Sequence, residues 1–236
     1  LVYSASNELI GDMQLISNQM FKVFNLLIDS IEDLTYVKDD IEDYIEDVSD
    51  KAESSTQGAV ADCINLGVVE GDINTGGITG YISFEYTFDL EDDIEMPQKI
   101  ATDLKYMVSA VVRDCTNLGS ITSRKNCAGG ITGAMKFGYI YNCGSAGDIT
   151  STSGDYVGGI AGQSEGTIGL CSSRAVLSGG KYIGGIAGSG KTILNCYSVV
   201  NIEDYTQYAS SIAADTTDDA NIKDNYFVSD KFAGIN

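Results

Sequence analysis

The chain has 236 residues, of which 43% are hydrophobic, and its 34 acidic and 14 basic side chains give a formal net charge of −20. This charge repels nucleic acid and anionic lipid, so neither is expected as a partner. The absence of histidine excludes Ser-His or Cys-His nucleophiles and most catalytic zinc sites. No apolar run approaches the roughly 20 residues that span a bilayer, so we expect no membrane insertion here.

Residues 1–58 are predicted to form an amphipathic, coiled-coil-like helical segment. Between 5 and 52, apolar side chains recur in steps of three and four, which is typical of such a helix. They are Leu9, Met13, Ile16, Met20, Val23, Leu27, Ile31, Leu34, Val37, Ile41, Ile45 and Val48. We expect this segment to pack along or cap the next domain. It either breaks near 30–36 into a helix pair or leaves a free part that forms a coiled coil and mediates oligomerisation.

From 59 to 236 the sequence repeats itself, and each copy can be aligned on a cysteine. These are Cys63, Cys115, Cys143, Cys171 and Cys196, at intervals of 52, 28, 28 and 25 residues. A repeat of this length with short β-like segments is typical of one coil of a β-solenoid. We therefore predict a mainly β fold, a right-handed parallel β-helix of about five to six coils, plus the N-terminal helical segment.

Stacking in register would align equivalent residues of successive coils along ladders. The isoleucines that follow paired glycines would form an inward ladder: Ile78, Ile131, Ile160, Ile186, Ile212 and Ile235. The glycines would permit a tight bend or a close backbone approach. They are Gly76–Gly77, Gly129–Gly130, Gly158–Gly159 and Gly184–Gly185.

The five aligned cysteines would form an internal file of buried free thiols. Neighbouring coils bring their Cα atoms within disulfide range, but parallel side-chain directions suit the required dihedral angle poorly. No Cys-x-x-Cys spacing is present, so we expect no metal site. Cys127 lies outside this file, and the repeat assigns it no role.

An insertion at 81–113 accounts for the long first interval. It supplies the candidate contact residues Phe84, Tyr86, Phe88 and Tyr106. The segment either displays these side chains to a partner or forms a hairpin that only extends a sheet. The acidic runs 89–95 and 215–219 lack the spacing of known calcium loops and are interpreted as solvated loops.

The segment 185–192, GIAGSGKT, matches the phosphate-binding P-loop pattern formally. A P-loop must open a helix whose N-terminal amides hold phosphate. Here a β-branched, repeat-like segment follows instead, and 156–167 carries the same glycines without the Lys-Thr pair. We therefore expect no nucleotide and no other cofactor.

The repeats resemble the GLUG-type repeat, an aromatic or apolar residue followed by Gly-Gly-Ile/Leu-x-Gly and then an Asn-Cys-Tyr-like strand. The best matches are YVGGIAGQSEGTIGLCSS (156–173) and YIGGIAGSGKTILNCYS (182–198). The resemblance covers 59–236, and departs from the pattern at the insertion and at SSIAA (210–214). It implies a β-helical region of a bacterial surface or secreted protein. Such repeats also occur beside the catalytic domain of some IgA-cleaving metallopeptidases, whose His-Glu-x-x-His motif this chain lacks.

The expected function is a non-catalytic structural or adhesive module that displays loops to a partner. Because the chain opens at Leu1, we interpret it as a piece of a larger extracellular or cell-surface bacterial protein. The partner would be an unknown protein or glycan on host or neighbouring cells. The alternatives are a carbohydrate-active or carbohydrate-binding β-helix, for which no paired carboxylates stand out, and a spacer without a ligand.

Overall fold

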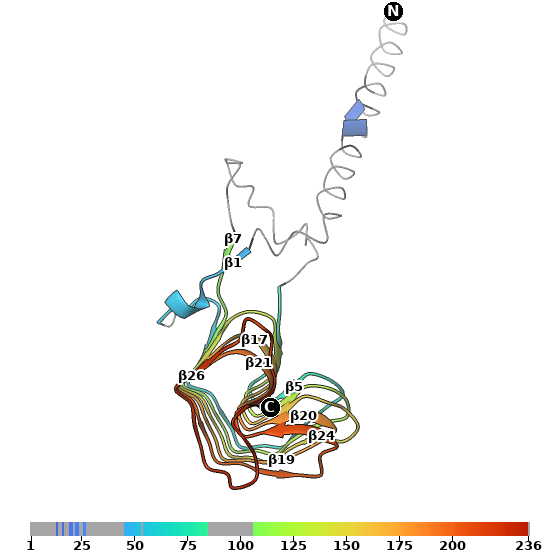
Figure 1. Cartoon of the computed structure of the whole chain (residues 1–236). Helices are drawn as coiled ribbons and strands as arrows, with labels where there is room; N and C mark the ends of the chain where they lie inside the picture. The colour runs from blue at the N-terminus through green and yellow to red at the C-terminus, as the bar shows by residue number, and fades with distance from the viewer. Residues whose placement is uncertain are drawn as a thin grey trace, which may run out of the picture. The chain divides into compact units, whose positions relative to one another are not determined.

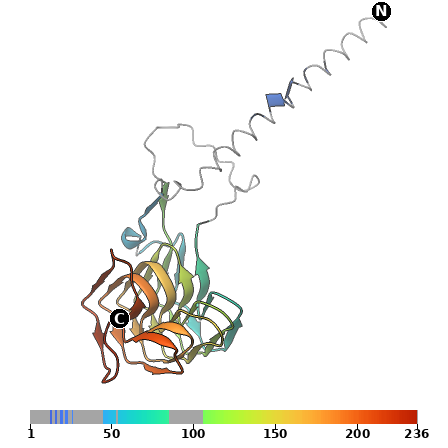
Figure 2. The ribbon, with the colours of Figure 1, turned by 45° about the vertical axis from the view of Figure 1, so that its right-hand side comes forward.

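The computed structural model describes residues 45–52, 54–84 and 106–235, together with seven separate residues between 13 and 26. The chain divides into two compact units, 1–46 with 101–106 and 47–100 with 107–236. The second unit is a β-solenoid, which confirms the predicted solenoid architecture. Its coils overlap in the view of Figure 1, and the turned view of Figure 2 shows them stacked next to one another.

Three parallel sheets, C, D and E, take one short strand from each successive coil, and the last coil contributes a strand to sheet C but none to sheets D and E. Sheet C contains β3 (Ile64–Asn65), β9 (Thr116–Asn117), β14 (Gly144–Ser145), β18 (Ser172–Ser173), β22 (Tyr197–Ser198) and β27 (Tyr226–Phe227). Sheet D contains β4 (Val69–Gly71), β10 (Ile121–Ser123), β15 (Ile149–Ser151), β19 (Val176–Ser178) and β23 (Asn201–Glu203). Sheet E contains β5 (Thr75–Gly76), β11 (Ala128–Gly129), β16 (Val157–Gly158), β20 (Lys181–Gly184) and β24 (Gln207–Ser210).

The nine-stranded sheet B closes each coil. Its strands are β2 (Ala59–Ala61), β6 (Thr79–Ile82), β8 (Val111–Arg113), β12 (Thr132–Met135), β13 (Tyr139–Tyr141), β17 (Ala161–Gly169), β21 (Ala187–Leu194), β25 (Ala213–Asp215) and β26 (Asn221–Lys223). The long strand β17 pairs with both β12 and β13, and β21 likewise pairs with both β25 and β26.

The uninterrupted part of the solenoid makes four turns. Sheet B places Val112, Ile140, Ile168, Ile193 and Ile222 in one register, at intervals of 28, 28, 25 and 29 residues. This uninterrupted stack is shorter than the five to six coils predicted. The strands of 59–82 continue the stack on the other side of the insertion.

The interior holds two separate apolar cores. One core lies against sheet B and contains four of the five buried cysteines, all except Cys127, and most of the isoleucines that follow the paired glycines. The other lies between sheets D and E, with Ile121, Val157 and Leu177 fully buried. Each coil therefore encloses two lobes.

The paired glycines lie where the chain crosses from one core to the other, a region we call the waist. In one coil, Val157 belongs to the second core and Ile160 to the first, with Gly158 and Gly159 between them. A β carbon on Gly159 would lie 2.0 Å from Ser173 Oγ and 2.1 Å from the carbonyl oxygen of Gly185. Close contacts with Asn117, Ser145 and Ser198 of sheet C recur at Gly77, Gly130 and Gly185, at 2.7, 2.0 and 2.1 Å respectively.

The isoleucine ladder lies largely inside the first core. Ile131, Ile160 and Ile186 are fully buried, Ile212 is 2% exposed, and Ile78 is partly buried against the same core. Consecutive members are joined through their backbones, for example by the Ile160 N–H donating to Ile186 O at 2.8 Å. The prediction that Ile235 continues the ladder was wrong: Ile235 is 44% exposed and pairs with Ala213, and the Ile212 N–H donates to Gly234 O at 2.8 Å instead.

The prediction of an N-terminal α segment in the fold class was wrong. Among the described residues no helix reaches seven residues, so neither the amphipathic helix nor a coiled coil is supported. The end of the predicted helix forms instead β1 (Ile45–Asp47) and the 3-10 turn η2 (Ser49–Lys51). Of 1–44 the structure describes only Met13, Ile16, Gln19, Met20, Lys22, Val23 and Leu26, which have helical backbone but compose no described element, and the remainder lies outside the described residues.

Tertiary hydrogen bonds explain why the helical pattern fails at 45–52. Strand β1 pairs with β7 (Tyr106–Val108), and the Val48 N–H donates to Val108 O at 2.9 Å. The Asp47 carboxylate accepts from the Gly138 N–H at 2.8 Å, and Ser49 Oγ accepts from the Ala110 N–H at 2.9 Å. These bonds tie the segment to the solenoid and override its local helical preference. No helix in the described part of the chain is long and apolar enough to cross a bilayer.

Candidate binding groove

The five aligned cysteines form a file beside sheet B, and all are free thiols. Each thiol donates to the carbonyl oxygen two residues earlier, at 3.0 to 3.3 Å. Burial raises the pKa of Cys115 to about 11 and that of Cys171 well above its usual value. The Cys171 thiol is hydrogen-bonded to Cys143 and Cys196 and lowers the pKa of both. We interpret the file as packing with internal hydrogen bonds rather than as a reactive centre.

We expect Cys115 and Cys127 to react slowly with iodoacetamide in the native protein. Burial raises the pKa of each from 9.0 to about 11, so thiolate is scarcer by roughly a hundredfold than in the unfolded chain. Labelling at pH 8, followed by peptide mass spectrometry, should show this deficit relative to urea-unfolded protein, with half-buried Cys63 as internal reference. Equal rates in native and unfolded protein would contradict the structure. Because both pKa values are raised, their contribution to stability should be lost as the pH rises from 9 to 11.

The P-loop-like segment is part of a strand. Residues Ala187–Leu194 form β21, whose backbone pairs with β17 on one side and with β25 and β26 on the other. No phosphate-binding helix follows within the described residues, since β22 begins at Tyr197. The Lys191 ammonium pairs with the Asp219 carboxylate at 2.8 Å, and lowers the pKa of that carboxyl to about 2.

Only part of the predicted contact element is described. Phe84 stacks on Phe137, with ring centroids 4.0 Å apart and planes 7° apart. Tyr106 is the first residue of β7, but its side chain lies outside the described part, as do Tyr86 and Phe88. The structure therefore places the root of the insertion against the turn after β12, and Phe84 is the one predicted contact side chain within its described residues.

A second ladder, which the sequence analysis missed, runs along one corner of the solenoid. Tyr156, Tyr182 and Tyr208, the tyrosine ladder, have φ values of 65°, 61° and 58°. Their rings stack with centroids 4.9 and 5.0 Å apart and planes 10° and 11° apart. Cys127 and Asn74 occupy the equivalent positions of the two preceding coils, one residue before the strands of sheet E. An alignment of the residues that lie two positions before each pair of glycines would have revealed this corner position. It would also have shown that Cys127 occupies the position that is tyrosine in later coils.

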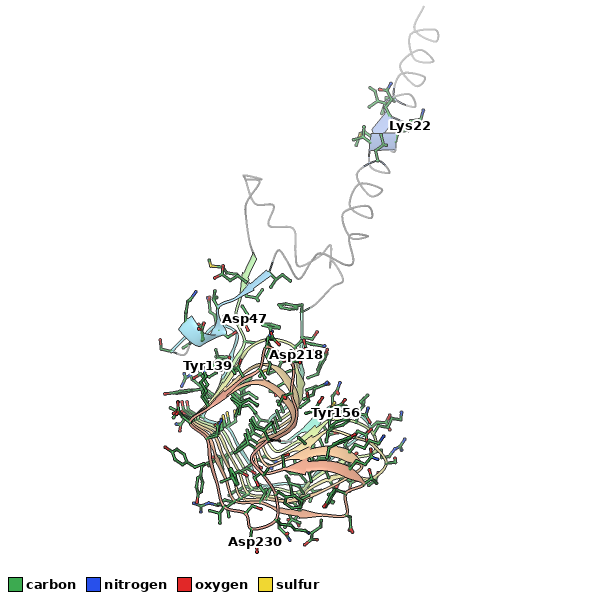
Figure 3. All side chains as sticks on the ribbon, in the orientation of Figure 1. Lys22, Asp47, Tyr139, Tyr156, Asp218 and Asp230 are labelled. Carbon is green, nitrogen blue, oxygen red and sulfur yellow. The ribbon has the colours of Figure 1, made fainter. Side chains whose placement is uncertain are left out.

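Side chains from sheet B face this corner. Tyr81, Ala134, Gln163, Ser189 and Asp215 share one register across β6, β12, β17, β21 and β25. The Cys127 thiol donates to Gln163 Oε1 at 3.8 Å, which joins the two sides. We call the space between the corner and these side chains the groove. Figure 3 labels Tyr156 beside the strands of sheets B and E.

The groove contains a pocket of about 250 Å³. Amide groups of Asn74, Asn126 and Gln163 line it, together with the ring of Tyr81, which is 49% exposed. Lys136 and Glu165 form an ion pair at its rim, and both are about half exposed. Phe137, against which the insertion root packs, directly follows Lys136 in the chain.

Tyr156 and Cys127, two titratable groups beside the groove, are uncharged at neutral pH. Burial raises the pKa of the Tyr156 phenol, and the Asp215 carboxylate raises it further, so the hydroxyl stays protonated at neutral pH. Burial likewise keeps the Cys127 thiol protonated, with a pKa of about 11. In the described ranges, no three His, Cys, Asp or Glu side chains are grouped to hold a metal ion. The groove offers hydrogen-bond donors, acceptors and aromatic rings, and thus suits recognition rather than nucleophilic chemistry.

No family model matches the chain, so its resemblance to GLUG-type repeats is not confirmed. No curated protein matches it significantly. Among solved structures, it is similar to that of a "putative immunoglobulin A1 protease" from Bacteroides ovatus, with 22% identity and a TM-score of 0.46. The match covers 75% of this chain and 48% of that protein, so the chain spans about half of that protein's length.

Proposed function

We propose that this chain is a non-catalytic adhesive module of a bacterial surface or secreted protein, and that its solenoid presents the groove and the insertion to a partner. The observation that carries this proposal is the groove, where aromatic and amide side chains from several coils line a pocket open to solvent. The cysteines and the P-loop-like Lys191, which the sequence alone could suggest for catalysis or nucleotide binding, have structural roles. The cysteines pack internally, and Lys191 pairs with Asp219 on a strand.

A carbohydrate-active enzyme is the alternative class. Hydrolysis of a glycosidic bond requires two carboxyl groups that flank one site. The only carboxylate lining the groove pocket is that of Glu165, which is paired with Lys136. This favours binding without turnover.

The experiment compares binding with cleavage by the same preparation. We expect the labelled full chain to bind saturably to mucin-coated surfaces or to cells, and to release no reducing ends from a panel of plant and host polysaccharides. A variant lacking 86–105 separates the insertion from the groove as the contact element. Release of reducing ends would identify an enzyme, and absence of saturable binding would identify a spacer. Either result would overturn the proposal.

A further inference from the structure

We propose that the groove binds a neutral glycan, with one sugar ring in the pocket and the following sugar units along the tyrosine ladder. This inference rests on the proposed adhesive function and specifies its ligand class. It is carried by the relation between the ladder and the pocket, by the side chains that line the pocket, and by the charge of the chain.

The pocket lies at the two coils where the ladder has no ring. Tyr156, Tyr182 and Tyr208 occupy this corner in three successive coils, whereas Cys127 and Asn74 occupy it in the two before. Both of these smaller residues line the pocket. Its volume of about 250 Å³ is below the roughly 300–1,000 Å³ of drug-sized sites and suits one ring.

The spacing of the ladder suits a polymer of rings. Neighbouring tyrosine rings lie 4.9 and 5.0 Å apart, which is close to the length of one hexose unit along an extended glycan. A glycan lying along the groove would therefore meet the same corner position once per sugar. Because the spacing of the coils matches the spacing of the sugars, each coil can contact one sugar unit in the same way.

The side chains around the pocket match sugar hydroxyls. The side-chain amides of Asn74, Asn126 and Gln163 carry both donors and acceptors, and Tyr81 adds an aromatic ring with a hydroxyl. The amide oxygens of Asn126 and Gln163 each accept one hydrogen bond already, from the Asp155 N–H and the Cys127 thiol, and each keeps a second lone pair. Sugar hydroxyls need both kinds of partner. The net charge of −20, with Asp215 beside the ladder, disfavours uronic and sialic acids.

A proline-rich peptide fits this groove less well. Such peptides dock with their rings against exposed aromatic faces. In the tyrosine ladder the faces cover one another, since the planes are only 10° and 11° apart. These stacked faces are therefore not free for such docking, whereas the tyrosine hydroxyls can still hydrogen-bond to a polyhydroxylated chain.

The test is calorimetric titration of the full chain with defined oligomers. The neutral probes are cellohexaose, xylohexaose, mannohexaose and chitohexaose; hexagalacturonate and a proline-rich decapeptide test charge and polymer class. We expect at least one neutral probe to bind, and Tyr81→Ala to weaken it by about tenfold, the equivalent of one lost contact. Tyr226→Ala is the matched control, because Tyr226 is 69% exposed on sheet C, outside the groove lining.

A second variant fills the pocket instead of removing a contact. Cys127→Tyr should extend the tyrosine ladder by one ring and abolish binding of the neutral probe. The fold should be retained, because three tyrosines already occupy this position with φ between 58° and 65°, and Cys127 has a φ of 66°. An unchanged circular dichroism spectrum and melting temperature would verify that the variant is folded.

Three results would overturn the inference: no neutral probe binds, the peptide or hexagalacturonate binds more tightly, or Tyr81→Ala and Cys127→Tyr leave the affinity unchanged. The outcomes separate this inference from the proposed function. Mucin or cell binding that persists without oligosaccharide binding would refute the glycan groove alone. Oligosaccharide binding without any attachment to mucin or cells would refute the adhesive function and leave the groove in place.

Discussion

Replacing Gly159 with alanine is expected to destabilise the solenoid severely, by about 3 kcal/mol or more. The new β carbon would lie 2.1 Å from the carbonyl oxygen of Gly185 and 2.0 Å from Ser173 Oγ. The first of these atoms belongs to the backbone of the neighbouring coil, so it cannot move without disturbing the ladder of hydrogen bonds there. Urea unfolding followed by circular dichroism measures the loss.

Gly144 provides the matched control. It lies in β14 of sheet C, away from the waist, and a β carbon there would meet nothing closer than Ser172 Oγ at 3.6 Å. We expect Gly144→Ala to leave the free energy of unfolding unchanged or slightly increased. Adding Ser173→Ala to Gly159→Ala should not restore stability, because the Gly185 carbonyl remains. Equal stability of Gly159→Ala and Gly144→Ala would show that the waist is not packed as described.

Truncating Ile160 to alanine is expected to lower the free energy of unfolding by about 2–5 kcal/mol. Ile160 is fully buried in the first core, and its removal leaves a cavity between coils that are joined by backbone hydrogen bonds on both sides. The rigid ladder restricts collapse of the cavity, so we expect a value in the upper half of that range.

Ile235 is the control for this truncation because it is an isoleucine of the last coil that is 44% exposed and pairs with Ala213, one position after the ladder. Ile235→Ala should cost about 1 kcal/mol or less. Both variants are measured by the same denaturant titration. A cost that does not differ between Ile160 and Ile235 would mean that the isoleucine ladder does not determine the stability of the solenoid.

The periodic part of the fold could be predicted because stacking in register converts a sequence repeat into spatial ladders. Matching cysteines and Gly-Gly-Ile motifs reveal which residues lie above one another, and glycines beside buried isoleucines indicate close backbone approach. The division of each coil into two lobes could not be predicted. Sheet C strands are only two residues long, for example Gly144–Ser145, and so short a strand has no measurable alternation.

The errors arose where tertiary contacts decide the structure. At 45–52 the apolar spacing suits a helix, but hydrogen bonds that Asp47 and Ser49 accept from backbone N–H groups of Gly138 and Ala110 stabilise a strand and a 3-10 turn. The groove was missed for a different reason. Its walls come from residues one position before sheet E strands and from outward residues of sheet B, and only the folded coil brings these two registers together.

Residues in this solenoid pair chiefly with the coil directly before or after, as the backbone ladder through Ile131, Ile160 and Ile186 illustrates. This has a consequence for how such a gene can change its length. Duplicating or deleting one whole coil recreates at the junction the contacts that were there before, whereas a loss of half a coil would set sheet B strands against sheet D. Unequal recombination between repeats is therefore expected to preserve the fold only in steps of about one coil, so the length of the solenoid can change without any change to its packing.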